Sequence, residues 1–418
     1  MARPCRKWLA IHRVAQIESM SPTLPSTSDV TQDGRQKQFE LSVIMPCLNE
    51  EGTLADCIER IQKTLEENRI AGEIIVADNG SRDKSREIAQ AMGVRVVSVE
   101  DQGYGSALMG GIAAARSEYI IIGDADGSYD FSQIPVFLDR LRAGYQLVMG
   151  NRFAGGIQPG AMPPLHRYLG NPLLTAIGRL FFRAKCHDFY CGLRGFTRRA
   201  YERMTLRTTG MEFASEMVVK ASLFNLPVCE VPTTLSPDRR SGRSHLRTWH
   251  DGFRGLRFLL LYSPRWLFLY PGLALLVVGF AIAGWILPSP RKIGHSFLDI
   301  HTLLYGAAAI LTGFQAVVFA LFTKLFGITE GLLPEDRRLA RVFRLLTLER
   351  GLLVGALLLL IGIGVATYSA YIWSRSGFGP MNPFILVRLV AAALVLITLG
   401  VEIVLSSFFL SILALARK

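Results

Sequence analysis

Four long apolar segments occupy the second half of this 418-residue chain. They are residues 267–287, 303–322, 352–372 and 389–415. Each is close to or above the roughly 20 apolar residues that an α-helix needs to cross the hydrocarbon core of a bilayer. Because backbone polar groups cannot stay unpaired in lipid, such segments are predicted to be membrane-spanning helices. The sequence therefore predicts a transmembrane domain over residues 266–418.

A segment with helical spacing precedes the first apolar segment. Its basic residues are Arg247, His250, Arg254 and Arg257, and its apolar residues are Trp249, Phe253, Leu256 and Leu260. A helix over residues 247–265 would carry one basic and one apolar face, which is typical of helices that lie in the membrane interface. The stretch 335–349 repeats this pattern, so a second interface helix is predicted there.

Basic residues are distributed unevenly along the chain. The formal charge is +12, but the arginines gather beside the apolar segments, which fits anionic lipid headgroups or phosphates better than a nucleic acid. We therefore expect no nucleic-acid partner. The connection 323–351 and the C-terminus are richer in Lys and Arg than the connections 288–302 and 373–388. The positive-inside rule then predicts a multi-pass membrane protein whose soluble domain is cytoplasmic.

Residues 1–39 begin basic and continue rich in Ser, Thr, Pro and Gln. Their apolar content is interrupted too often to form the core of a signal peptide. This segment is predicted to be a flexible leader, with a start codon assigned too early as the alternative.

The region between this leader and the interface helix, residues 40–246, alternates between strand and helix patterns. Apolar runs suited to buried strands occur at Leu41–Pro46, Glu73–Asp78, Val94–Val99 and Glu118–Asp124, and helical patterns fill the gaps. This order predicts an α/β domain with a mostly parallel sheet, helices on both faces and right-handed crossovers. Ligands of such sheets bind outside the carboxyl ends of the strands.

Polar and glycine residues follow each predicted strand. They are Cys47–Glu51, Asp78–Ser81, Gly103–Gly105 and Asp124–Asp126. Asp124 and Asp126 can turn toward one hard cation that also bridges phosphate oxygens. Asp130 either assists them or caps a helix that begins near Ser132.

Each of these motifs also has a simpler interpretation. Asp78-Asn79-Gly80-Ser81 fits a plain turn, since Asn-Gly favours positive φ, but a strand-end acid could also accept hydrogen bonds from a nucleobase. The glycines around Tyr104 could bring backbone N–H groups against a phosphate at a helix N-terminus. No single motif decides between the alternatives.

Eight short motifs occur together in one order. They are "SVIMPCLNEE" (42–51), "IIVADNGSRDKS" (74–85), "GYGSAL" (103–108), "DADGSYD" (124–130), "GNRF" (150–153), "DFYCGLRGF" (188–196), "FASEM" (213–217) and "DRRSGRSH" (238–245). In this order the chain resembles glycosyltransferase family 2 with the GT-A fold. The resemblance is strongest to polyprenyl-phosphate hexosyltransferases such as dolichyl-phosphate mannose and glucose synthases.

The resemblance implies an enzyme that transfers a hexose, with inversion, from a nucleotide-diphosphate sugar (UDP-glucose or GDP-mannose type) to a polyprenyl phosphate. It implies Mg²⁺ or Mn²⁺ held by Asp124 and Asp126. The implied donor-nucleotide contacts are Pro46, Leu48, Asn49, Glu50, Asp78, Asn79, Gly103, Gly105, Asp124 and Ala125. The implied acceptor-phosphate contacts are Arg152, Arg167 and Arg239. The implied catalytic residues are Asp126, Arg152 and Glu216, the last orienting the sugar hydroxyls.

Two other classes of protein compete with this interpretation. A processive polysaccharide synthase of the same fold usually carries a Gln-X-X-Arg-Trp motif, whereas "SPRW" at 263–266 lacks the glutamine. A non-catalytic scaffold or flippase partner is disfavoured because Asp124, Asp126 and Arg152 are all present. A homo-oligomer is compatible with the sequence.

Overall fold

The structure is a computed structural model that describes residues 39–239, 248–334, 347–379 and 383–414. The predicted leader, except residue 39, lies outside the described residues. So does the predicted interface helix over 335–349, except residues 347–349.

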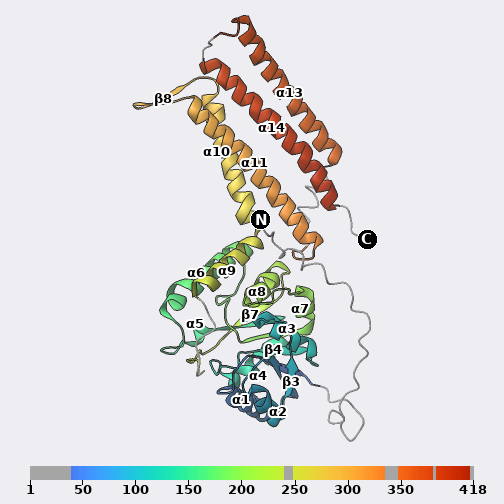
Figure 1. Ribbon diagram of the computed structural model, residues 1–418. Coiled ribbons are helices and arrows are strands. Elements are labelled where there is room, and N and C mark those ends of the chain that lie inside the picture. The colour runs from blue at the N-terminus through green and yellow to red at the C-terminus, as the bar shows by residue number, and fades with distance from the viewer. Residues whose placement is uncertain (1–38, 240–247, 335–346, 380–382, 415–418) are drawn as a thin grey trace, which may run out of the picture. The chain divides into compact units, whose positions relative to one another are not determined.

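A seven-stranded sheet organises the α/β region, which we define as residues 40–239. Its strands are β1 (Leu41–Cys47), β2 (Gly72–Asp78), β3 (Arg95–Ser98), β4 (Tyr119–Ile122), β5 (Leu147–Asn151), β6 (Arg194–Thr197) and β7 (Val228–Pro232). The order across the sheet is β3-β2-β1-β4-β6-β5-β7, and every strand except β6 runs parallel (Figure 1). The predicted mostly parallel sheet is confirmed, and the four predicted strands are present.

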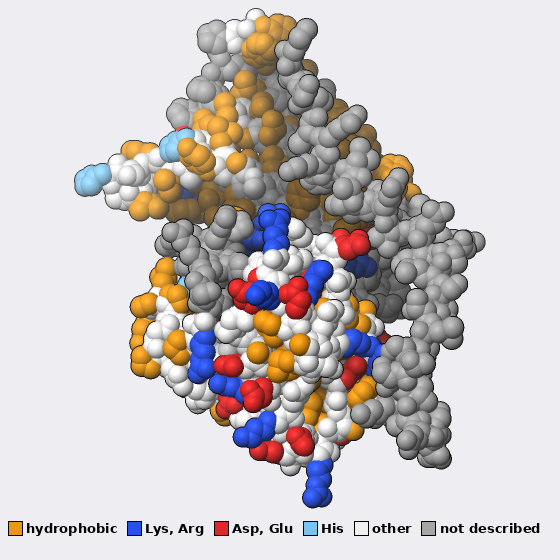
Figure 2. All heavy atoms as spheres, turned by 60° about the horizontal axis from the view of Figure 1, so that its bottom comes forward, with side chains coloured by type: hydrophobic (Ala, Val, Ile, Leu, Met, Phe, Trp, Pro, Cys, Tyr) orange, Lys and Arg blue, Asp and Glu red, His pale blue; other side chains and the backbone are white. Residues whose placement is uncertain are grey.

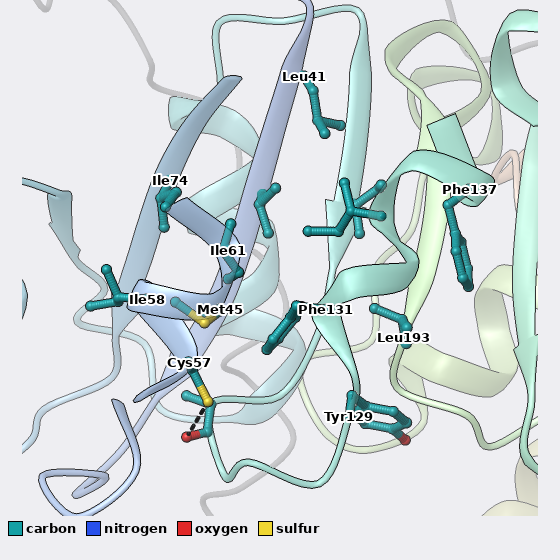
Figure 3. Packing of buried hydrophobic residues seen from close by; sticks show 14 of the residues in the cluster. Leu41, Met45, Cys57, Ile58, Ile61, Ile74, Tyr129, Phe131, Phe137 and Leu193 are labelled. Carbon is teal, nitrogen blue, oxygen red and sulfur yellow. Dashed lines mark hydrogen bonds between the residues drawn. The ribbon is translucent and has the colours of Figure 1, made fainter. Parts of the chain in front are cut away.

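Successive residues of a strand point to opposite faces of the sheet. Because the strands carry apolar residues on both faces, helices cover both. Val43 and Met45 of β1 enter one apolar cluster, and Ile44 enters the other. The first cluster, shown in Figure 3, is covered by α1 (Leu54–Glu67), α2 (Ser85–Ala91) and α4 (Ile134–Arg142). The second is covered by α3 (Tyr104–Ala114), α6 (Asn171–Phe182), α7 (Arg198–Met204) and α8 (Phe213–Leu223).

Among the described residues of the second half of the chain, four helices are long and apolar enough to cross a membrane. They are α10 (Tyr270–Ile286, continued from the short helix η4, Arg265–Leu269), α11 (Ile300–Thr329), α13 (Leu348–Arg375) and α14 (Pro383–Ala414). A short hairpin of β8 (Arg291–Ile293) and β9 (Ser296–Leu298) joins α10 to α11. A Cβ on Gly279 would lie 2.8 Å from the Gly306 carbonyl oxygen, so glycine lets α10 and α11 pack closely. The four predicted helices are confirmed.

The helix α9 (Thr248–Leu261) lies within the predicted interface helix. Phe253, from its predicted apolar face, is exposed. A further face, which the sequence did not reveal, docks on the α/β region: Phe258 and Leu259 are buried in the second cluster. Arg254 adds two hydrogen bonds to Glu212, of 2.6 and 2.9 Å. Contact of α9 with the membrane stays a prediction.

Phe131 tests the packing of the first cluster, where it is fully buried beside the end of β4 (Figure 3). Phe131→Ala should cost about 3–5 kcal/mol through lost burial and a residual cavity. For an α/β region of this size that lowers the thermal midpoint by roughly 6–20 °C, as measured by near-UV circular dichroism in detergent. Val136→Ala is the control, because Val136 is exposed and its change should stay within about 0.5 kcal/mol. Equal midpoints for the two variants would contradict the packing.

Candidate active site

The ends of the parallel strands bring the predicted site residues to one rim. Cys47 of β1 pairs with Asp78 of β2, and Ile44 of β1 pairs with Ile122 of β4. The loops beyond the strands are also bonded to one another. The Thr53 hydroxyl donates to the Ala125 carbonyl oxygen at 2.7 Å, and the Cys57 thiol contacts the same oxygen at 3.5 Å (Figure 3). The loop after β4 is therefore fixed by the residues that follow β1.

Asp124 and Asp126 are both half-buried on this rim, and hydroxyl groups orient both. The Tyr104 hydroxyl donates to Asp124 Oδ1 at 2.9 Å. The Ser128 hydroxyl and backbone N–H both donate to Asp126 Oδ1, at 2.5 and 3.0 Å. Sequence reasoning gave Tyr104 no role, although it stands in one of the quoted motifs.

Asp130 differs from the other two aspartates. It is exposed, and its carboxylate accepts a 3.0 Å hydrogen bond from the Ser132 backbone N–H. This caps the short helix η2 (Phe131–Gln133). Of the two interpretations of Asp130, the structure supports helix capping.

The donor set on the rim suits a hard divalent cation. Asp124 and Asp126 place two carboxylates close together at a strand end, and carboxylate oxygens are ligands that Mg²⁺ and Mn²⁺ prefer. Within the described residues, no group of three or more His, Cys, Asp or Glu side chains could hold a metal. Asp124 and Asp126 would therefore fit a metal that completes its coordination with water and with phosphate oxygens of a ligand.

Arg239 lies beside the aspartate loop, and its implied contact with an acceptor phosphate stays a prediction. Its backbone N–H donates to the Asp126 carbonyl oxygen at 3.3 Å. Its side chain is exposed and lies 3.8 Å from a carboxylate oxygen of Asp56. A Cβ at Gly127, where φ is +74°, would lie 3.7 Å from Arg239 Cδ. A basic side chain thus borders the carboxylates.

Arg152 is buried in a charged pair. It begins the short helix α5 (Arg152–Gly155). Its Nε and Nη2 donate to the two carboxylate oxygens of Asp188, at 2.7 and 2.8 Å, and its backbone N–H donates to the same carboxylate at 3.1 Å. Asp188 was missed as a functional residue, although it opens the motif "DFYCGLRGF". Arg167 lies apart in the short helix η3 (His166–Gly170), half-buried against the ring of Tyr168.

The Asp78 and Asn79 side chains are both bonded to protein groups. Asp78 is fully buried and accepts from the N–H groups of Gly80 and Ser81 and from Arg86. Burial opposes ionisation, but the hydrogen bonds from Ser81 and Arg86 outweigh it and lower the pKa of Asp78. Asn79 donates to the carbonyl groups of Val99 and Asp101 and accepts from the Gly103 N–H at 2.7 Å. These bonds fit the turn interpretation; contact with a nucleobase stays a prediction.

The loop after β1 exposes the side chains of Leu48, Asn49 and Glu51. Leu48 and Asn49 are exposed, Pro46 is half-buried and Glu50 is buried. Asn49 has φ of 58° and accepts a 2.8 Å hydrogen bond from the Arg82 N–H. Of the predicted donor contacts in this loop, Leu48 and Asn49 are therefore the accessible ones.

Gly103 and Gly105 are required by packing within the protein. A Cβ on Gly103 would lie 2.2 Å from the Thr209 carbonyl oxygen, and one on Gly105 would lie 2.3 Å from that of Thr208. The Ser106 N–H, in the first turn of α3, donates to the same Thr209 oxygen at 3.1 Å. The loop Thr208–Gly210 therefore covers part of this helix N-terminus, and phosphate binding there stays a prediction.

Glu216 lies beneath that loop and is fully buried. Its carboxylate accepts from the Thr208 hydroxyl at 2.7 Å and from Lys220 Nζ at 2.9 Å. Burial acts to raise its pKa, but the bonds from Thr208 and Lys220 lower it overall. In this structure Glu216 supports the loop and does not reach the rim, so its predicted contact with sugar hydroxyls stays a prediction.

The sequence matches two family models. Glycosyl transferase family 2 matches residues 42–205, and the glycosyltransferase family 2 C-terminal transmembrane region matches residues 321–414. A low-salt glycan biosynthesis hexosyltransferase of Haloferax volcanii is 39% identical over 374 residues, which cover 88% of each chain. The chain belongs to glycosyltransferase family 2. It is a glycosyltransferase with an apolar C-terminal membrane region, as the sequence motifs predicted.

Two further relatives carry lipid-phosphate names. A dolichyl-phosphate hexose transferase of Haloferax volcanii is 29% identical and covers 51% of this chain and 89% of its own length. An undecaprenyl-phosphate 4-deoxy-4-formamido-L-arabinose transferase of Pseudomonas aeruginosa is 26% identical and covers 68% of this chain and 79% of its own length. The predicted resemblance to polyprenyl-phosphate sugar transferases is confirmed.

The pair Arg152–Asp188 provides a stability test. Asp188→Asn removes the negative charge that compensates a buried guanidinium, which should cost about 3–5 kcal/mol. Glu67→Gln is the control, because its partner Lys63 is 3.8 Å away and both side chains are exposed. That change should cost less than about 0.5 kcal/mol. Thermal unfolding of both variants measures the difference, and a control variant as unstable as Asp188→Asn would refute it.

Proposed function

We propose that this glycosyltransferase transfers a hexose from a nucleoside-diphosphate sugar to a polyprenyl phosphate, with inversion, at the cytoplasmic face of a membrane. The observation that carries the proposal is the pair Asp124 and Asp126, half-buried at the end of β4 and bordered by Arg239. Carboxylates at this edge of a parallel sheet suit a metal–diphosphate donor. The apolar helices of the same chain suit an acceptor that resides in lipid.

The names of the relatives support the acceptor class. A dolichyl phosphate and an undecaprenyl phosphate are the named acceptors of the two lipid-phosphate relatives, and both are polyprenyl phosphates. The cytoplasmic side rests on the uneven basic residues of the loops, under the positive-inside rule.

The acceptor needs little activation for this reaction. A polyprenyl phosphate is already an anion near neutral pH, so one of its oxygens can attack the anomeric carbon without a strong general base. The bond from that carbon to the diphosphate oxygen breaks, and its electron pair leaves with the nucleoside diphosphate. Attack from the opposite face inverts the anomeric centre, so an α-linked donor gives a β-linked product. The protein's task is positioning and charge stabilisation.

Different residues would carry out the positioning and the charge stabilisation. Asp124 and Asp126 would hold Mg²⁺ or Mn²⁺, which offsets the charge that develops on the departing diphosphate. Arg239, beside the aspartates, would contact phosphate oxygens. Arg167 would bind the acceptor phosphate, since a guanidinium can bind phosphate through two parallel hydrogen bonds. Arg152, whose Nε and Nη2 are held by Asp188, would contact that phosphate through its remaining Nη1 group.

The direct test incubates purified full-length protein and Mn²⁺ with a panel of UDP- and GDP-sugars, with and without a polyprenyl phosphate. A lipid carrying one sugar, formed only when the polyprenyl phosphate is present, is the expected product. No lipid-linked sugar from any donor would refute the proposal. A long polymer would identify a processive synthase instead.

Asp124 and Asp126 should matter for activity, whereas their neighbour Asp130 should not. Asp126→Asn should lower kcat/KM by roughly 10²–10³-fold, because several kcal/mol of metal-dependent stabilisation is lost. Asp130→Asn is the matched control: Asn also caps helices well, so its activity should stay near that of the unaltered protein. Chelation of divalent ions should abolish turnover, and added Mn²⁺ should restore it. Full activity of Asp126→Asn would exclude it as a metal ligand.

Tyr104 should tune metal affinity through Asp124. Tyr104→Phe removes the 2.9 Å hydrogen bond to Asp124 Oδ1 and should raise the Mn²⁺ concentration for half-maximal activity about 10–100-fold. Tyr119→Phe, at the opposite end of β4, is the control and should leave the metal dependence unchanged. A metal titration of both variants at saturating donor separates the outcomes. Coincident curves would show that the Tyr104 hydroxyl does not support the metal site.

A further inference from the structure

The helical segment of residues 164–182, which includes η3 and α6, leaves apolar side chains uncovered. Its exposed apolar residues are Leu165, Tyr168, Leu169, Leu173 and Leu180, of which Tyr168 is 73%, Leu173 52% and Leu180 58% exposed. They recur at helical spacing along one face, which we call the α6 stripe. Figure 2 shows hydrophobic side chains along the left margin of the α/β region, where Figure 1 places α6. Such a contiguous exposed patch marks an interaction site.

The opposite face of α6 is firmly docked. Thr175, Gly178 and Phe182 are buried, and a Cβ on Gly178 would lie 2.3 Å from the ring of Phe189. The orientation of the helix is therefore fixed by the core of the α/β region. The α6 stripe is held outward and does not depend on a mobile segment.

The last turn of α6 lies beside the start of the first membrane helix. Phe181 stacks on Trp266, with ring centroids 5.1 Å apart and planes 17° apart, and Trp266 packs edge-on against Tyr270. Trp266 belongs to η4, from which the first candidate span begins at Arg265. Trp and Tyr at the end of a span are typical of the membrane–water interface. The C-terminal end of α6 thus lies beside the residues from which the first candidate span begins.

The charges around the stripe fit the same surface. Arg179, Arg183 and Lys185 are exposed at its C-terminal end. Lys and Arg side chains near an anionic leaflet are attracted to its surface potential. An apolar face flanked by basic residues is the composition of helices that lie in a bilayer interface.

We propose that the α6 stripe lies in the bilayer surface, with its leucines among the upper acyl chains and its basic residues on anionic phospholipid headgroups. The α/β region is then held against the membrane by one of its own helices, in addition to the chain connection through α9. This surface was absent from the sequence-based predictions, and it does not depend on the reaction proposed above.

Site-specific quenching in the full-length protein tests this contact. Leu173→Cys and Leu180→Cys are labelled with an environment-sensitive fluorophore, and Val136→Cys on exposed α4 is the control. Cys5 and Cys229 are first replaced by Ser. The remaining thiols of Cys47, Cys57, Cys186 and Cys191 are buried and react slowly. The labelled proteins are placed in nanodiscs that contain anionic phospholipid.

Lipids brominated near the top of the acyl chain should quench the α6 labels at least about threefold more than the Val136→Cys label, because interfacial helices reach about 5–10 Å into the headgroup boundary. Aqueous iodide should show the reverse order. Quenching of the α6 labels by iodide alone would overturn the proposal, since the stripe would then face water. Protection from both quenchers would also overturn it, because protein would then cover the stripe.

Discussion

The parallel pairing of β1 with β2 and β4 is the constraint on which the site depends. It brings the ends of three strands to one edge, so that residues far apart in sequence become neighbours. The residues that follow β1 then hold the loop of the two aspartates at the Ala125 carbonyl, which accepts from the Thr53 hydroxyl and contacts the Cys57 thiol. Because loops at this edge need not complete the sheet, they are available for ligands.

The sequence predicted the elements whose pattern is local. Apolar runs such as that of β4 are long enough to identify a buried strand, and the membrane helices are identified by their length together with their apolar composition. β6 was not predicted, because its short sequence Arg-Gly-Phe-Thr has a charge and a glycine. Arg194 is buried there only because its guanidinium donates to the carbonyl oxygens of Phe189, Cys191 and Ala214. Such compensation depends on tertiary contacts that residue spacing does not encode.

The same limit applies to the rim. The pattern correctly placed Asp78 and Asn79 at a strand end, but it could not show what their side chains would bind. The Asn79 side chain forms hydrogen bonds with the loop that leads to Gly103. Position 103 requires glycine because the loop Thr208–Gly210 comes too close for a Cβ. Whether a polar rim residue meets a ligand or a neighbouring loop is decided by which distant segments fold over it.

The buried carboxylate of Glu216 connects this rim to the membrane entry. Burying a Glu–Lys pair costs desolvation free energy, which is offset only when hydrogen bonds satisfy the remaining polar atoms. Glu216 meets this condition through Lys220, the N–H groups of Arg207 and Thr208, the Thr208 hydroxyl and, at 3.1 Å, the hydroxyl of Tyr262. Tyr262 follows α9 and stands three residues before the first span begins at Arg265. Displacing the end of α9 would therefore remove a donor from a buried charge, which ties the position of the membrane entry to the loop that covers the rim.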